Sequence, residues 1–236
     1  MKKKLLPLVL TVATPALSIT ASATSTIVGT DFEGTTENGM TLEGITYTTT
    51  GATVASTFAD LTVNNTIGSG NLFTTTDADG VFAVANNTSN GGEWNIQIDF
   101  TTGADQIILE TFSFDWLNFN GSGNNQNALR GTEITFDLTQ AGSSVISGPL
   151  ELNTGSINTV NDGVQTDAFD LTGTATLDAN TTYTIFLQAG DDPATPAGNN
   201  FGFEAITLTG TVVPEPSSAL LLGLGSLALI SRRKRA

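Results

Sequence analysis

Apolar and polar residues alternate along several stretches of the chain, and this period of two predicts β-strands with one buried and one solvated face. The alternation is clear from Glu93 to Phe100, from Thr132 to Gln140 and from Thr182 to Gln188. The residues expected to point inward are Trp94, Ile96, Ile98 and Phe100, then Ile134, Phe136 and Leu138, and finally Tyr183, Ile185 and Leu187. These stretches are typical of antiparallel strands that cover a core on one side.

A fourth strand is predicted from Phe201, with Phe203, Ile206 and Leu208 pointing inward. The parity of this set slips by one residue at Ala205, which predicts a β-bulge. Further strands are expected near residues 40–48, 52–63, 81–85, 107–117, 144–152 and 168–178.

Turn dipeptides separate many of these strands, and they are Asn38-Gly39, Asp79-Gly80, Asn90-Gly91 and Asp162-Gly163. The pattern shows no core helix, no linker and no clear internal repeat. About ten short strands of this kind predict an all-β fold, a single antiparallel β-sandwich of the jelly-roll type.

The first 23 residues have the layout of a secretory signal peptide. Lys2, Lys3 and Lys4 form a cationic start, and an apolar segment follows over residues 5–17. Ala21 and Ala23 form a small-x-small site, so we expect signal peptidase to cut before Thr24. The alternative is an anchor that is not cleaved.

The C-terminal segment combines an extended polar motif, an apolar run and a basic end. Pro214, Glu215 and Pro216 precede an uncharged run over residues 219–230, which we expect to form a short transmembrane helix. The basic residues that follow are Arg232, Arg233, Lys234 and Arg235, which the positive-inside rule places in the cytoplasm. The alternative is a buried or amphipathic terminal helix.

This arrangement resembles the PEP-CTERM sorting signal of bacteria that make extracellular polysaccharide. The resemblance covers residues 213–236 and implies recognition by exosortase, a membrane cysteine protease, with cleavage near the Pro-Glu-Pro motif. It also implies an inner-membrane precursor that is then transferred to the cell surface or extracellular matrix. The predicted organisation is a signal peptide at 1–23, a β-sandwich domain at 24–212 and a sorting segment at 213–236.

The predicted domain is strongly acidic. Residues 24–212 contain one basic residue, Arg130, against 22 Asp and Glu, a formal charge of −21. Such a surface repels nucleic acid, whose binding depends on Lys and Arg, and it favours solubility and divalent cations. The chain has no Cys, so disulfides do not hold the exported fold together.

Residue types that are absent exclude several catalytic mechanisms. Without His and Cys, the chain has no Ser-His-Asp triad, no Cys-His pair and no zinc site with nitrogen or sulfur ligands. Without Lys in residues 24–212, a Ser-Lys dyad and a Schiff base are also excluded. Glycoside hydrolysis by two carboxylates stays open.

A second resemblance concerns the two ends of the domain. Residues 29–34, Gly-Thr-Asp-Phe-Glu-Gly, and residues 203–208, Phe-Glu-Ala-Ile-Thr-Leu, are similar to the first and last strands of galactose-binding-like jelly rolls. Many carbohydrate-binding modules belong to that group. The resemblance implies a structural calcium ion at Glu33 and Glu204.

The candidate glycan-binding residues follow one aromatic strand. Trp116 is followed by an amide-rich stretch that contains Asn118, Asn120 and the single Arg130 of the domain. Aromatic rings and planar polar groups suit sugar binding, so we expect a ligand surface here. The alternative is that Trp116 belongs to the core.

The sequence therefore predicts an exported surface or matrix protein that associates with extracellular polysaccharide and is not an enzyme. Two alternatives stay open, a glycan-active enzyme that uses two carboxylates and a structural coat protein bridged by calcium.

Overall fold

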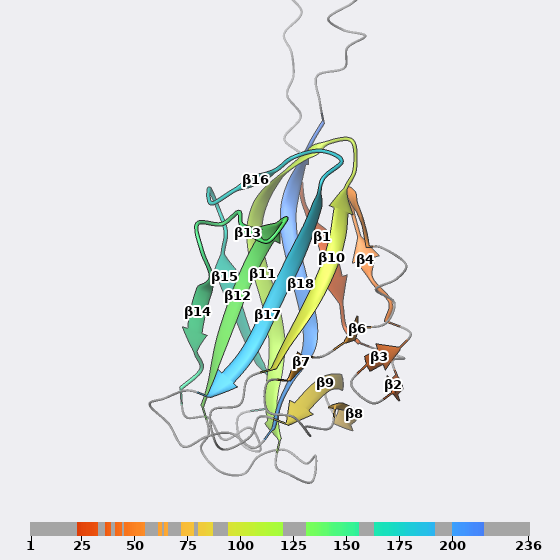
Figure 1. Ribbon diagram of the computed structural model, residues 1–236, viewed down its shortest axis with the longest axis vertical. Helices are drawn as coiled ribbons and strands as arrows, with labels where there is room; N and C mark the ends of the chain where they lie inside the picture. Colours follow the sequence, from red (N-terminus) through yellow and green to blue (C-terminus); the bar gives the residue numbers. More distant parts are fainter. Residues whose placement is uncertain are drawn as a thin grey trace, which may run out of the picture.

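The computed structural model describes residues 23–32, 36–38, 41–43, 45–54, 61–62, 64–65, 72–77, 80–86, 94–119, 131–155, 163–191 and 200–214. These residues form two antiparallel β-sheets that pack face to face, with a small third sheet beside them (Figure 1). The predicted all-β sandwich is confirmed.

The first sheet places the last strand of the domain at its centre. Its main path is β15 (Gln165–Asp170), β11 (Gln106–Phe119), β18 (Asn200–Val213), β1 (Thr24–Thr30) and β4 (Thr48–Thr49). Three short additions complete it, and they are β16 (Thr176–Leu177) on β11, β9 (Gly80–Asn86) on β18 and β8 (Leu72–Asp77) on β9. The hairpin of β8 and β9 sets Asp77 opposite Gly80, around the turn predicted at Asp79-Gly80.

The second sheet is built on the three stretches with the clearest alternation. Its path is β13 (Ser143–Ser144), β12 (Thr132–Gln140), β17 (Thr182–Asp191), β10 (Trp94–Thr102) and β5 (Ala52–Val54). Two further strands join it, β14 (Leu150–Asn153) on β12 and β7 (Asn64–Asn65) on β10. The small third sheet contains β2 (Thr36–Asn38), β3 (Thr41–Glu43) and β6 (Leu61–Thr62).

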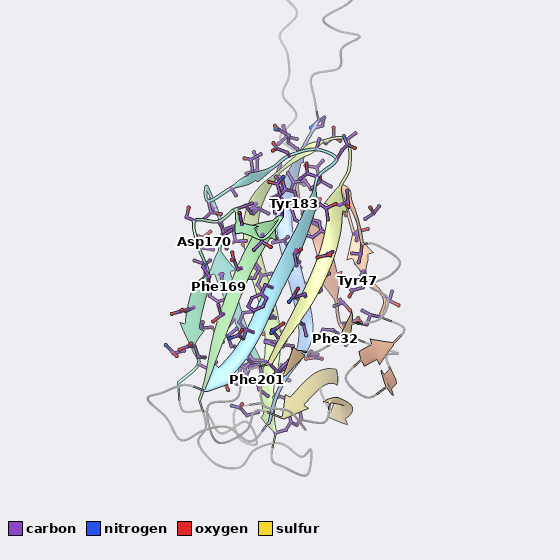
Figure 2. The ribbon with its side chains drawn as sticks, viewed as in Figure 1. Phe32, Tyr47, Phe169, Asp170, Tyr183 and Phe201 are labelled. Atoms are coloured by element: carbon purple, nitrogen blue, oxygen red, sulfur yellow. The ribbon has the colours of Figure 1, made fainter. Side chains whose placement is uncertain are left out.

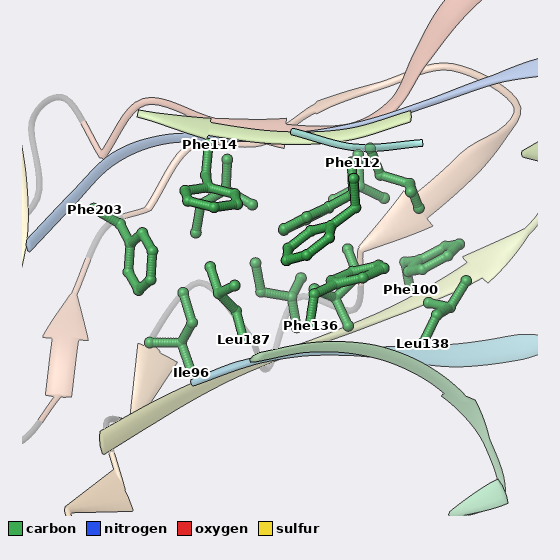
Figure 3. Packing of buried hydrophobic residues seen from close by; sticks show 14 of the residues in the cluster. Ile96, Phe100, Phe112, Phe114, Phe136, Leu138, Leu187 and Phe203 are labelled. Carbon is green, nitrogen blue, oxygen red and sulfur yellow. The ribbon is translucent and has the colours of Figure 1, made fainter. Parts of the chain in front are cut away.

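The core lies between the two sheets and is rich in aromatic rings. Phe112 from β11 stacks on Phe136 from β12, with ring centroids 4.0 Å apart and an interplanar angle of 14°. Phe114 and Phe203 meet edge to face with their centroids 5.7 Å apart. Figure 3 shows Phe112, Phe114 and Phe203 from the first sheet facing Phe136, Leu187 and Ile96 from the second. Every residue predicted to point inward on the four alternating strands is buried.

The parity slip predicted at Ala205 is confirmed. Phe114 of β11 pairs with Ile206, whereas Trp116 pairs with Phe203, so Glu204 and Ala205 together oppose the single residue between them on β11. The bulge lets both Phe203 and Ile206 reach the core, although they are three residues apart. Two predicted strands, 144–152 and 168–178, are each interrupted, because the chain turns between β13 and β14 and between β15 and β16.

The two ends of the described domain lie side by side. Thr24, at the start of β1, pairs with Thr211 of β18, two residues before that strand ends at Val213. The carboxylate of Glu110 accepts hydrogen bonds from both threonine hydroxyls, at 2.6 Å for Thr24 Oγ1. The domain is therefore closed at the end from which both flanking segments leave.

Candidate functional site

The structure corrects the expectation for Trp116 and Asn118. Both side chains are fully buried, and the Trp116 ring stacks on Phe201 with centroids 5.2 Å apart. Asn118 Oδ1 accepts a hydrogen bond of 3.4 Å from the hydroxyl of Thr132 on the other sheet. Neither side chain can be a surface platform, because the end of β11 is covered on both faces. The other two predicted glycan-binding residues, Asn120 and Arg130, lie outside the described residues.

The segments that resemble a calcium site do come together. Thr30 of β1 pairs with Ile206 of β18, and Asp31, directly after β1, lines the same hollow as Ala205 of the bulge that contains Glu204. Glu204 is partly exposed, and Glu33 lies outside the described residues. Within the described part of the chain, no group of three or more acidic side chains could hold a metal ion. A calcium ion at Glu33 and Glu204 stays a prediction.

The outer face of the second sheet is a broad polar surface with one aromatic residue at its centre. Phe186 lies on the middle strand, β17, and its Cα partners on the two neighbouring strands are Gln97 and Asp137. Its side chain is partly exposed, whereas Ile185 and Leu187 on either side are fully buried. Phe186 therefore points away from the core, as the alternation along Thr182 to Gln188 requires.

Polar side chains surround Phe186 on all of the neighbouring strands. Those with a described side chain are Asn95, Gln97, Asp99 and Thr101 on β10, Thr184 and Gln188 on β17, Glu133, Thr135, Asp137 and Thr139 on β12, and Glu151 and Asn153 on β14. Carboxylates, amides and hydroxyls thus surround the ring of Phe186. This combination of a flat aromatic face and planar polar groups suits a polyhydroxylated ligand.

Hydrogen bonds hold several of these side chains in place. The hydroxyl of Thr184 donates to Asp99, and the hydroxyl of Ser144 donates to Asp137 over 2.7 Å. Gln97 donates from Nε2 to Asn95 Oδ1 over 3.4 Å. The face is therefore partly preorganised, which lowers the entropic cost of binding. The sequence carries one signal for this face, an aromatic residue at an outward position of a clearly alternating strand.

A second feature, a small hollow, lies on the outer face of the first sheet. It has a volume of about 250 Å³ and lies against β1, β4 and the bulge of β18. Its described lining residues are Thr26, Gly29, Thr30, Asp31, Thr46, Thr48, Ala205 and Thr207. Phe32 and Tyr47 directly follow Asp31 and Thr46 of this lining. Figure 2 shows Phe32 and Tyr47 at one edge of the sandwich and Phe169 and Asp170 at the opposite edge.

The residues predicted for export are mostly outside the described part of the chain. Ala23 and Pro214 are exposed and lie directly before β1 and directly after β18. Ala21, Glu215, Pro216 and the basic residues 232–235 are not among the described residues. No helix in the described ranges has the length and apolarity needed to cross a membrane, and residues 219–230 lie beyond those ranges.

Comparison with solved structures gives distant similarities. A carbohydrate-binding module of the β-sandwich superfamily is 12% identical, with a TM-score of 0.41 over 79% of this chain and 86% of that chain. A mannan-recognising carbohydrate-binding module, TmCBM27, is 10% identical, with a TM-score of 0.36 over 80% of this chain and 99% of that chain.

The enzymatically active domain of tailspike protein 4 from bacteriophage CBA120 is 9% identical, with a TM-score of 0.41 over 65% of this chain. The match spans only 19% of the length of that phage chain. No curated protein matches the chain in sequence.

One comparison in sequence does identify a functional segment. Residues 212–235 match the PEP-CTERM protein-sorting motif, which includes Pro214, Glu215, Pro216 and the basic residues. The match begins inside the last strand, because β18 ends at Val213. The motif marks this chain as an exported protein that exosortase sorts to the cell envelope.

Proposed function

We propose that this protein binds extracellular polysaccharide at the cell surface or in the matrix, without changing the polysaccharide chemically. The glycan lies on the outer face of the second sheet, across β10, β17 and β12. The sorting motif supports the location, and the polar face supports the ligand class.

The observation that carries this proposal is the position of Phe186. It is an aromatic side chain turned outward at the centre of a five-strand path, between Gln97 and Asp137. The ring lies outside the core, which Ile185 and Leu187 on either side of it help to fill. Stacking against the apolar face of a sugar ring gives Phe186 a role, and the surrounding amides and carboxylates hydrogen-bond the sugar hydroxyls.

The charge of the domain selects among glycans. The carboxylates on this face are Asp99, Glu133, Asp137 and Glu151. The whole domain has a formal charge of −21, with a single Arg. Glycans that carry uronate, sulfate or phosphate are repelled, whereas neutral glycans are not. We therefore expect the ligand to be a neutral polysaccharide.

Binding of the purified full-length chain to the extracellular polysaccharide of its own bacterium tests the proposal. We expect Phe186→Ala to weaken binding at least about tenfold, a loss of roughly 1.4 kcal/mol, and Phe186→Tyr to retain it. Ile108→Ala is the matched control, because Ile108 is 41% exposed on the other sheet. Equal binding by Phe186→Ala and the wild type would overturn the assignment of this face.

The same experiment separates binding from catalysis. A glycan-active enzyme would use two of the carboxylates on this face, such as Asp99 and Asp137, which flank β17 on either side. The release of reducing ends from the bound polysaccharide is measured alongside binding. We expect none, and turnover that disappears in Asp99→Asn or Asp137→Asn would replace binding with hydrolysis as the function.

A further inference from the structure

We infer that the hollow on the first sheet is a second glycan site, which takes one neutral sugar unit, so that the domain can bridge two polysaccharide chains. This inference rests on the proposed function, because it assumes that the second sheet binds the first chain. The two sites lie on the outer faces of opposite sheets, with the core between them (Figures 1 and 3).

Three backbone irregularities meet at the hollow. The first is a bulge in β1 between Thr26 and Val28, and the second is the bulge at Glu204 and Ala205 in β18. Phe32, just after β1, has a left-handed backbone with φ of 56°. A non-glycine residue in that region is strained and persists only where the surrounding structure imposes it. Bulges and strain of this kind are frequent beside binding sites.

The ring of Phe32 fixes the rim of the hollow. Phe32 is fully buried, and its backbone N–H donates a hydrogen bond of 3.1 Å to the hydroxyl of Thr30. Thr30 is itself 8% exposed, so Asp31 is held between two anchored residues. The Asp31 side chain is exposed and lines the hollow. The strained segment thus places the Asp31 carboxylate at the edge of the hollow.

Two small residues leave the hollow open. Gly29 and Ala205 contribute little or no side chain, so the space between the neighbouring threonines is unfilled. A Cβ atom on Gly29 would lie 3.1 Å from Thr26 Cγ2 and 3.4 Å from both the carbonyl oxygen of Ile206 and the hydroxyl of Thr207. A methyl group added at Gly29 would therefore occupy the floor of the hollow without meeting a prohibitive clash.

The chemistry of the lining fits a neutral sugar. Five threonines supply hydroxyls that can donate or accept, and Asp31 supplies a strong acceptor. The described lining residues include no cation, so an anionic ligand has no partner there. The volume of about 250 Å³ is below the roughly 300–1,000 Å³ of sites for drug-sized ligands, which favours a single ring over a chain.

Bridging is measured by capture of a second chain. Polysaccharide from the producing bacterium is immobilised, the full-length protein is bound, and fluorescently labelled polysaccharide is then added. The protein is confirmed as monomeric by light scattering, because a dimer would also bridge. We expect capture by the wild type and loss of capture by Gly29→Ala and by Asp31→Asn, with binding to the immobilised chain unchanged. Asp31→Asn keeps the test valid if Gly29→Ala disturbs the fold, because Asp31 is exposed.

Free monosaccharides then test the ligand class. Saturation-transfer NMR with glucose, galactose, mannose and N-acetylglucosamine should show that at least one of these sugars contacts the wild type. Gly29→Ala should weaken the affinity for that sugar about tenfold or more. Galacturonate should show no contact with the protein. Asp170→Asn is the matched control for Asp31→Asn, because Asp170 is exposed on β15 and belongs to neither proposed site.

The outcomes separate the two proposals. A wild type that binds immobilised polysaccharide but captures no second chain would overturn the second site and leave the proposed function standing. Equal capture by the wild type, Gly29→Ala and Asp31→Asn would also overturn the second site and leave the proposed function standing. A wild type that binds no polysaccharide would overturn both.

Discussion

The indole Nε1 of Trp116 donates a 2.8 Å hydrogen bond to the carboxylate of Asp167 on the edge strand β15. Trp116 is buried, and this carboxylate satisfies its only polar atom. Asp167 has Phe114 as its Cα partner and therefore points toward the core from the edge of the sheet. An inward-pointing charge on an edge strand also discourages pairing with another chain.

The first prediction removes this acceptor. Asp167→Leu leaves the indole N–H buried without a partner, which we expect to lower the free energy of unfolding by about 1–3 kcal/mol. Asp167→Asn keeps an acceptor at the same place and should lose less. Denaturant unfolding of the two variants and the wild type measures the difference. Equal losses in the two variants would show that the hydrogen bond does not matter.

Trp116 also marks the limit of prediction from the sequence. Alternation correctly placed the four clearest strands and the bulge at Ala205, because one face of each strand is buried and the other solvated. At the end of β11 this contrast is lost, since Leu117 and Phe119 form a separate buried cluster with Val164 packed against it. The sequence around Trp116 is apolar on both faces, so alternation could not decide which face is covered.

The two proposed binding sites depend on contacts between distant parts of the chain, which the sequence alone does not give. Phe186 is an outward aromatic residue already in the sequence pattern, but its polar neighbours are known only once the strands carrying Gln97 and Asp137 are seen to flank it. The hollow forms only where β1, β4 and β18 meet. Two of its lining residues, Thr48 and Ala205, are far apart in the chain. The sorting motif differs, because its residues are contiguous and can be recognised without any fold.

The second prediction concerns the Glu110 carboxylate at the closed end of the domain. Hydrogen bonds from Thr211 and Thr24 hold the pKa of Glu110 below its ordinary value of 4.5. A folded-state pKa that is lowered stabilises the fold fully above the unfolded value, and the effect is lost as the pH falls through the folded pKa. We therefore expect Glu110→Gln to lower the melting temperature at pH 7 but not at pH 2. Thermal unfolding across this range measures it, and a deficit that persists at pH 2 would contradict the prediction.

The third prediction concerns Tyr47, whose buried hydroxyl has no hydrogen-bond partner among the described residues. Burial also raises the pKa of this phenol. Removing an unpaired buried hydroxyl relieves its desolvation penalty, so Tyr47→Phe should stabilise the protein by about 1 kcal/mol. Tyr183→Phe is the matched control and should destabilise it, because the Tyr183 hydroxyl accepts a 2.8 Å hydrogen bond from the backbone N–H of Asp178. A loss of stability in Tyr47→Phe would reveal a partner for its hydroxyl.

The fourth prediction tests calcium at Glu33 and Glu204. A bound ion stabilises the folded state by about 2.7 kcal/mol at a concentration 100 times its dissociation constant. The melting temperature should therefore be higher in calcium than in chelator, and Glu204→Gln should abolish the difference. Glu133→Gln on the opposite sheet should keep it. Identical melting temperatures of the wild type in calcium and chelator would exclude the ion.

The fifth prediction concerns the place where the sorting motif leaves the fold. Val213, the last residue of β18, pairs with Gln106, and Pro214 follows it directly, so the motif begins without a spacer. The sequence predicts an extended Glu215, because a proline fixes its own φ and disfavours helix in the residue before it. Replacing all three residues by alanine allows the helix predicted at 219–230 to continue toward β18 and removes the extended peptide. We expect the precursor to accumulate in the membrane fraction and the surface-exposed form to disappear, as measured by fractionation and immunoblotting in the producing bacterium.

The control is Glu151→Gln, which changes an exposed acidic position on β14 and should be sorted normally. Normal surface delivery of the triple-alanine variant would mean that these three residues are not the sorting determinant.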